Sequence, residues 1–175
     1  MNILRKLLPF DHESGQLNVV IDTPKGSRNK FAFDFERNAY ILKSVLPKGA
    51  VFPFDFGSIP GTEASDGDPV DALVLLDQPV FPGILVESRL IGVIEAEQTE
   101  NGKTERNDRL IAVAECSKTH EKIRSIGDLN PTLVEEIEHF FVSYNQQRGK
   151  KFKPLGRFGP KRAKRLVAKQ TKRKK

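Results

Sequence analysis

The stretch Asp66-Gly67-Asp68-Pro69-Val70-Asp71-Ala72-Leu73-Val74 places three carboxylates within six residues and then becomes apolar. Gly67 lets the backbone turn between the first two carboxylates, and Pro69 fixes φ and donates no amide hydrogen. The same residue types also form ordinary solvated turns. However, Asp71 stands at the start of an apolar run that reads as a buried strand, where a charge needs a partner. The stretch therefore predicts a site for a hard divalent cation such as Mg²⁺ or Mn²⁺.

Outward from this stretch, the first two thirds of the chain read as short strands separated by turns. Residues 19–21 are apolar, and Phe31, Phe33 and Phe35 alternate with less apolar neighbours as in a half-buried strand. Further strands are expected at residues 39–46, 50–56, 72–76, 84–94 and 109–115. Many short strands at this spacing indicate a barrel or a sandwich.

The final third of the chain changes period. Asn130 can cap a helix whose first residue is Pro131, and Gly149 supplies a stop. The apolar residues of this helix fall on one face, namely Leu133, Val134, Ile137, Phe140, Phe141 and Tyr144. Shorter helices are expected at residues 117–125 and 160–169.

The charge is divided unevenly along the 175 residues. Residues 150–175 hold 13 of the 29 Lys and Arg residues and no acid, which leaves 16 bases against 23 acids in the rest of the chain. We expect a single domain over residues 1–160 and a basic, flexible tail over residues 161–175. The tail can contact nucleic acid non-specifically, although solubility or docking on the acidic body explains it as well.

The cellular setting follows from what the sequence contains. Cys116 is the single cysteine, so no internal disulfide can form, and its place at the end of an apolar run predicts a buried thiol. No stretch approaches the roughly 20 apolar residues of a membrane span. The first residues lack the features of a secretory signal. We expect a soluble, cytoplasmic protein with no membrane association.

Three segments in this order resemble the family I soluble inorganic pyrophosphatases. They are the run Lys25-Gly26-Ser27-Arg28-Asn29-Lys30, the acidic stretch described above, and the run His139-Phe140-Phe141-Val142-Ser143-Tyr144. The resemblance implies an α+β fold, a small closed OB-like β-barrel of about five strands with flanking helices. It also implies Mg²⁺-dependent hydrolysis of inorganic pyrophosphate to two phosphates, and a homo-oligomer that is a hexamer in bacterial members.

The resemblance also implies roles for individual residues. Asp68 matches the carboxylate that accepts a proton from the attacking water. Asp66 and Asp71 match metal ligands, and Asp22 stands where the family has a glutamate near the metals. The matched substrate-binding positions are Lys30, Lys43, Phe56, Arg109 and Tyr144.

Several positions depart from the family pattern. Lys43 stands in place of an arginine, which keeps a charge but loses the bidentate fork. Phe56 replaces the tyrosine of an Asn-Tyr-Gly segment, so a hydroxyl is missing, and Phe52 replaces a neighbouring tyrosine. Ala32 replaces an acid, and Asn145 replaces a lysine.

The second metal segment of the family has a pattern close to D-x-x-G-x-x-D-x-K, and residues 99–109 depart from it. When Arg109 is aligned with the lysine, Asn107 falls at a ligand position, with Glu100 in place of the first aspartate. An inserted hairpin or a shift of one residue brings in Asp108 or Glu105 instead. The sequence leaves these alternatives open.

Two other functions compete with pyrophosphate hydrolysis. Phe52 and Phe56 make the pocket less polar, which favours a divergent phosphohydrolase for another phosphoanhydride or a weakly active relative. A nucleic-acid-binding module that acts through the basic tail belongs to a different class of protein.

Overall fold

The computed structural model describes residues 7–171. Within them, five strands are hydrogen-bonded neighbours in a closed ring, in the order β1 (Leu17–Thr23), β4 (Asp55–Ile59), β5 (Val70–Leu75), β8 (Arg109–Ala114) and β6 (Leu85–Glu100), which pairs with β1 again. The strands β7 (Lys103–Arg106) and β9 (Lys151–Phe158) pair with β6. The ring and the helices beside it confirm the expected α+β, OB-like fold.

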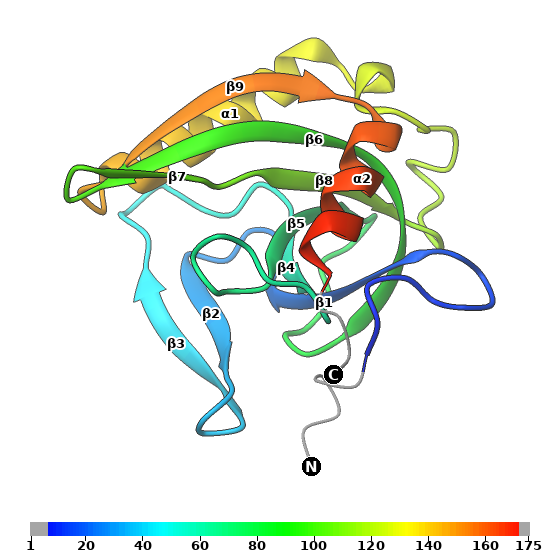
Figure 1. Cartoon of the computed structure of the whole chain (residues 1–175), viewed down its shortest axis with the longest axis horizontal. Helices are drawn as coiled ribbons and strands as arrows, with labels where there is room; N and C mark the ends of the chain where they lie inside the picture. The colour runs from blue at the N-terminus through cyan, green and yellow to red at the C-terminus, as the bar shows by residue number, and fades with distance from the viewer. Residues whose placement is uncertain (1–6, 172–175) are drawn as a thin grey trace.

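A separate hairpin stands away from this ring (Figure 1). It consists of β2 (Asn29–Asp34) and β3 (Ala39–Val45), which pair only with each other among the described strands. The aromatic side chains of β2 are half-buried, as their alternation predicted. The hairpin and the ring are separate sheets, and residues of both line the cavities described below.

The core lies on both faces of the ring sheet. β5 and β8 run parallel, and every residue of β8 and nearly every residue of β5 is buried, as expected of parallel strands covered on two sides. Leu73 faces the cluster that contains Phe141 of helix α1 (Pro131–Gln146). Val74 faces the cluster that contains Val167 of helix α2 (Pro160–Gln170). The two helices therefore cover opposite faces of the same strands.

Several expected strands have different bounds in the structure. The strand expected at residues 50–56 is wrong, because Phe52 exchanges backbone hydrogen bonds with Gly26 and Ser27 and β4 begins only at Asp55. β6 continues to Glu100, beyond the expected end at residue 94. β7 and β9 were not predicted. β9 contains Pro154 and Gly156, which obscure the alternation of its residues.

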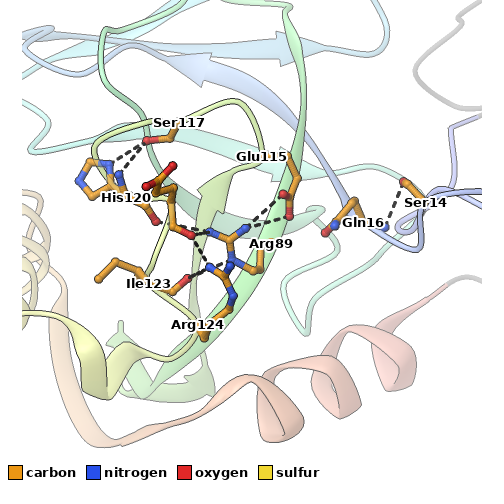
Figure 2. A network of polar contacts seen from close by, with 9 residues as sticks. Ser14, Gln16, Arg89, Glu115, Ser117, His120, Ile123 and Arg124 are labelled. Carbon is orange, nitrogen blue, oxygen red and sulfur yellow. Dashed lines mark hydrogen bonds and ion pairs between the residues drawn. The ribbon is translucent and has the colours of Figure 1, made fainter.

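The helix expected at residues 117–125 is wrong. Figure 2 shows Arg89, on β6, reaching this segment: its Nε donates to the carbonyl of Ile123 at 3.0 Å, and its Nη1 donates to the Glu115 carboxylate at 3.1 and 3.2 Å. The segment forms turns, and Arg89 bonds to it through the carbonyl of Ile123. Cys116 lies just beyond the end of β8 and is exposed, so the expectation of a buried thiol is also wrong.

The expected tail differs from the structure over most of its length. Residues 160–170 form α2, in agreement with the helix expected at residues 160–169. Ala163 and Val167, four residues apart, are fully buried, so this segment is packed against the domain and not free of it. Residues 172–175 lie outside the described residues. No helix within residues 7–171 has both the length and the apolarity to cross a membrane.

Candidate active site

Two adjoining cavities, with volumes of about 580 and 150 Å³, collect most of the predicted site residues. Lys30, Lys43, Asp68 and Asp71 line both cavities. The larger cavity also contains Asp22 and Phe56, and the smaller contains Asp66, Asn107, Asp108, Arg109 and Tyr144. The structure thus brings together residues from β1, the hairpin, the acidic stretch, β8 and α1.

Asp66 and Asp68 lie in the loop of residues 60–69 between β4 and β5, which we call the acidic loop, and Asp71 lies on β5 directly after it. Gly67 has a φ of +85°, which a residue with a Cβ rarely adopts, and Asp66 Oδ1 accepts the Asp68 amide at 3.1 Å. The amide of Glu63 donates to the carbonyl of Gln170 at 2.8 Å. The last turn of α2 therefore holds the start of the acidic loop.

Asp22 and Asp71 are positioned by β1 and β5. The register of β1 against β4 is irregular between Ile21 and Thr23, which is how the bulged strand aims Asp22 into the cavity. Burial, together with the charge of Asp71, raises the pKa of Asp22 to about 7. Burial, with the nearby charges of Asp68 and Asp71, raises the pKa of Asp66. The carboxylates of this wall therefore repel one another.

Two lysines of the hairpin face these carboxylates. The register of β2 against β3 is irregular beside Lys43, so that Lys30 pairs with Ser44 and both lysines reach the cavities. Lys30 Nζ lies 5.2 Å from the centre of the Phe56 ring and 5.4 Å from that of Tyr144. Two aromatic faces thus hold this ammonium group in place.

Arg109 is the most buried cation of the site, with 5% of its surface exposed. Because β5 and β8 are parallel neighbours, it lies beside Asp71, and its Nη1 contacts Asp71 Oδ2 at 2.7 Å. The same nitrogen donates to Asn107 Oδ1. The guanidinium carbon lies 4.9 Å from the centre of the Phe141 ring and 5.6 Å from that of Phe152.

The second metal segment presents an amide at the position expected of a carboxylate. Asn107 Nδ2 donates to Gln98 Oε1 at 2.8 Å, and both side chains line the smaller cavity. Glu100 pairs with Lys150 at 2.8 Å. Glu100 is absent from the linings of both cavities.

The two alternative ligands are also engaged with other groups. Glu105 pairs with Lys103, and neither of these residues lines a cavity. Asp108 lines the smaller cavity, but its Oδ1 accepts the Ala96 amide at 2.9 Å and Arg106 Nη2 at 2.7 Å. These bonds turn Asp108 toward β6 and Arg106.

One wall carries donor groups of the chemical type that binds a hard divalent cation, and the other wall does not. Asp66, Asp68 and Asp71 supply hard oxygen donors whose mutual repulsion a cation would relieve. Asn107 and Gln98 are neutral, and Arg109 already occupies an oxygen of Asp71. Within residues 7–171, no three His, Cys, Asp or Glu side chains are gathered in metal-binding geometry.

Three residues of the site had no signal in the sequence. Gln98 is brought beside Asn107 by the pairing of β6 with β7. Arg148 donates to the hydroxyl of Tyr144 and lines the smaller cavity. Tyr40 lines the larger cavity with a buried hydroxyl that has no hydrogen-bond partner among the described residues. Burial, together with the charge of Asp22, raises the pKa of Tyr40.

Comparisons with known proteins agree with the fold and with the order of the motifs. A family model described as inorganic pyrophosphatase matches residues 19–175. An inorganic pyrophosphatase of Synechocystis sp. is 37% identical over 149 residues, which are 85% of this chain and 86% of that protein. One of Corynebacterium efficiens is 40% identical over 135 residues, 77% of this chain and 82% of that protein.

A solved structure supports the same assignment. The crystal structure of inorganic pyrophosphatase from Thermus thermophilus has a TM-score of 0.87 and 33% sequence identity to this chain, and the match covers 98% of this chain and 97% of that one. The similarity therefore extends over nearly the whole of both proteins. The chain belongs to the inorganic pyrophosphatase family.

Proposed function

We propose that this protein hydrolyses inorganic pyrophosphate to two phosphates with a divalent cation, Mg²⁺ by preference and Mn²⁺ as an alternative. The observation that carries the proposal is the meeting of the acidic loop with Lys30 and Lys43 in two adjoining cavities. Pyrophosphate is a compact polyanion, so its hydrolysis needs cations for its oxygens and a base for the attacking water. This site offers both kinds of group side by side.

Asp68 is the proposed general base. Its carboxylate is exposed and lines both cavities, so it can accept a proton from a water molecule beside the substrate. Asp66 and Asp71 are the proposed ligands of the cation. Asp22 lies near enough to Asp71 for the charge of Asp71 to raise its pKa. When bound, a divalent cation lowers the pKa of water and neutralises phosphate oxygens.

The basic residues are proposed to hold the substrate. Lys30 is fixed over two rings and Lys43 faces it from β3, so each can neutralise phosphate oxygens as a point charge. Tyr144 and Arg109 line the same cavity. Phe56 offers no hydroxyl, which removes one donor that the family pattern contains.

The proposal is tested by phosphate release from pyrophosphate, with and without Mg²⁺, in the native chain and in Asp68→Asn. We expect metal-dependent release that falls by about 10² or more in the variant, the usual size of a lost general base. Asp11→Asn, at an exposed turn away from the cavities, removes the same charge and should retain full activity. Equal rates in the native chain and Asp68→Asn would contradict the proposal.

The proposal extends to the oligomeric state of the protein, its location in the cell and its contacts with nucleic acid. We propose a cytoplasmic homo-oligomer, a hexamer by family resemblance. The basic residues after Gly149 give the chain the means for non-specific contact with nucleic acid.

A further inference from the structure

Arg109 occupies a ligand oxygen of the acidic site. Its Nη1 lies 2.7 Å from Asp71 Oδ2, so the guanidinium already uses part of the capacity of this carboxylate to hold a cation. A guanidinium and a divalent ion also repel each other at such distances. Arg109 and a second metal ion are therefore alternatives for the same place.

Arg109 is held in that place from several directions. Besides Asp71, its Nη1 donates to the Asp108 carbonyl at 3.2 Å. Its guanidinium lies against the rings of Phe141 and Phe152, and its Nε is buried without a partner among the described residues. A group packed in this way is not free to swing aside as an exposed lysine would.

The wall beside Arg109 holds one carboxylate, that of Asp108, and its Oδ1 is already bonded to other groups. Asn107 and Gln98 bond to each other at 2.8 Å, and Asp108 is engaged by Arg106 and the Ala96 amide. Neutral amides are weaker partners for a hard cation than carboxylates. Arg109 is therefore a fixed positive charge beside the neutral amides of Asn107 and Gln98.

The side chains that line the smaller cavity carry a net positive charge. Six basic residues line it, namely Lys30, Lys43, Arg106, Arg109, Arg148 and Lys150, against the four aspartates 66, 68, 71 and 108. Protein cations therefore outnumber acids before any metal binds. A polyanionic substrate can be neutralised here with fewer metal ions.

We propose that Arg109 replaces one divalent ion of the site, so that each chain binds a single divalent cation, at the acidic loop. This deepens the proposed function and rests on it for the role of the acidic loop. Arg109 then positions Asp71, which is a ligand of the cation, and supplies a fixed positive charge. It does not itself transfer a proton.

The test counts metal ions in the absence of substrate. Mn²⁺ is titrated into the full-length chain, and free Mn²⁺ is followed by electron paramagnetic resonance. We expect one ion per native chain. In the variant Gln98→Asp/Asn107→Asp/Arg109→Lys, which introduces two carboxylates and a shorter cation, we expect two ions, the second with a Kd within about tenfold of the first.

The control is Gln78→Asp/Gln147→Asp, which changes the net charge by the same amount at exposed positions that line neither cavity. It should bind one ion, as the native chain does. The native count requires no substitution, so it stays decisive if the triple variant fails to fold. A native count of zero or two, or a folded triple variant with one ion, would overturn the proposal.

Two measurements on the native chain, the number of bound ions and the hydrolysis of pyrophosphate, distinguish this inference from the proposed function. Pyrophosphate hydrolysis by a native chain that binds two ions would overturn the inference and retain the function. One bound ion without hydrolysis in Mg²⁺ or Mn²⁺ would retain the inference and overturn the function.

Discussion

At the scale of single residues, Asp55 is a buried carboxylate with an unfilled acceptor. Its Oδ1 accepts the amides of Val80 and Lys25 at 3.2 and 3.4 Å, whereas its Oδ2 has no partner among the described residues. Burial raises the pKa of Asp55 above the ordinary value of 3.8. Ionising this group in the folded protein is therefore unfavourable.

We predict that Asp55→Asn stabilises the protein at pH 7. The folded state binds more protons than the unfolded state between pH 3.8 and the raised pKa, so native stability falls as the pH rises through this window. Asparagine keeps one acceptor oxygen and removes the buried charge, so the free energy of unfolding at pH 7 should rise. Urea unfolding at several pH values measures this.

The gain should shrink as the pH is lowered toward 4, because a growing fraction of the folded native chain then carries a neutral Asp55 and loses the buried charge that the variant lacks. Asp11→Asn serves as the control. Asp11 is only partly buried, and hydrogen bonds from Ser14 and Glu13 lower its pKa, so its replacement should give no gain at pH 7. A gain for Asp55→Asn that does not depend on pH would refute the assigned cause.

Residues of the site were predictable where neighbours in the sequence are neighbours in space. Asp66, Asp68 and Asp71 belong to one loop and strand, so their spacing already indicated a shared site. The pairing of Gln98 with Asn107 depends on the register of β6 against β7, which no local pattern specifies. Arg109 was recognised by position, but its contact with Asp71 follows from the parallel pairing of β5 and β8.

At the scale of elements, periodicity predicted the helices and strands with a continuous apolar pattern. The start of α1 agrees with the expected Asn130 cap and Pro131, because a capping residue and a long apolar face reinforce each other. β4 begins later than expected because the backbone of Phe52 bonds to Gly26 and Ser27 in a turn and does not pair with a strand. Burial alone therefore does not identify a strand.

Helix α2 provides the prediction at this scale. Val167 is fully buried in the cluster shared with β5 and β8, and the following turn holds the acidic loop through Gln170 and Glu63. We predict that Val167→Ala lowers the free energy of unfolding by about 1–3 kcal/mol, through lost apolar burial and a small cavity. Urea unfolding monitored by circular dichroism measures the difference.

Val45→Ala is the matched control, because Val45 is 52% exposed on β3 and should change stability by no more than about 0.5 kcal/mol. Equal stability of Val167→Ala and the native chain would mean that α2 behaves as the flexible tail expected from its charge. A loss of stability would show that its apolar positions anchor it despite that charge.

At the scale of the whole molecule, the uneven charge has a structural counterpart. Arg162 of α2 contacts Glu95 of β6 at 2.6 Å, so the basic C-terminal segment is joined to the acidic body by an ion pair as well as by its apolar face. The ring is covered by α1 on one face and α2 on the other. Large apolar side chains that remain exposed are then left for contacts outside the chain.

The turn between β5 and β6 carries the most exposed of these side chains. Phe81 is 82% exposed, and Ile84 and Leu85 follow it at 45% and 40%. If the protein is a homo-oligomer, as proposed, a second copy is the expected partner of this turn, because burying an aromatic side chain away from water is favourable.

We predict that Phe81→Asp shifts the assembly to smaller species in size-exclusion chromatography with light scattering, while the native chain stays oligomeric at the same concentration. Leu155→Asp, at an exposed position on β9 outside this turn, should leave the mass unchanged. An unchanged mass for Phe81→Asp would exclude this turn from the interface, and a monomeric native chain would refute the proposed assembly itself.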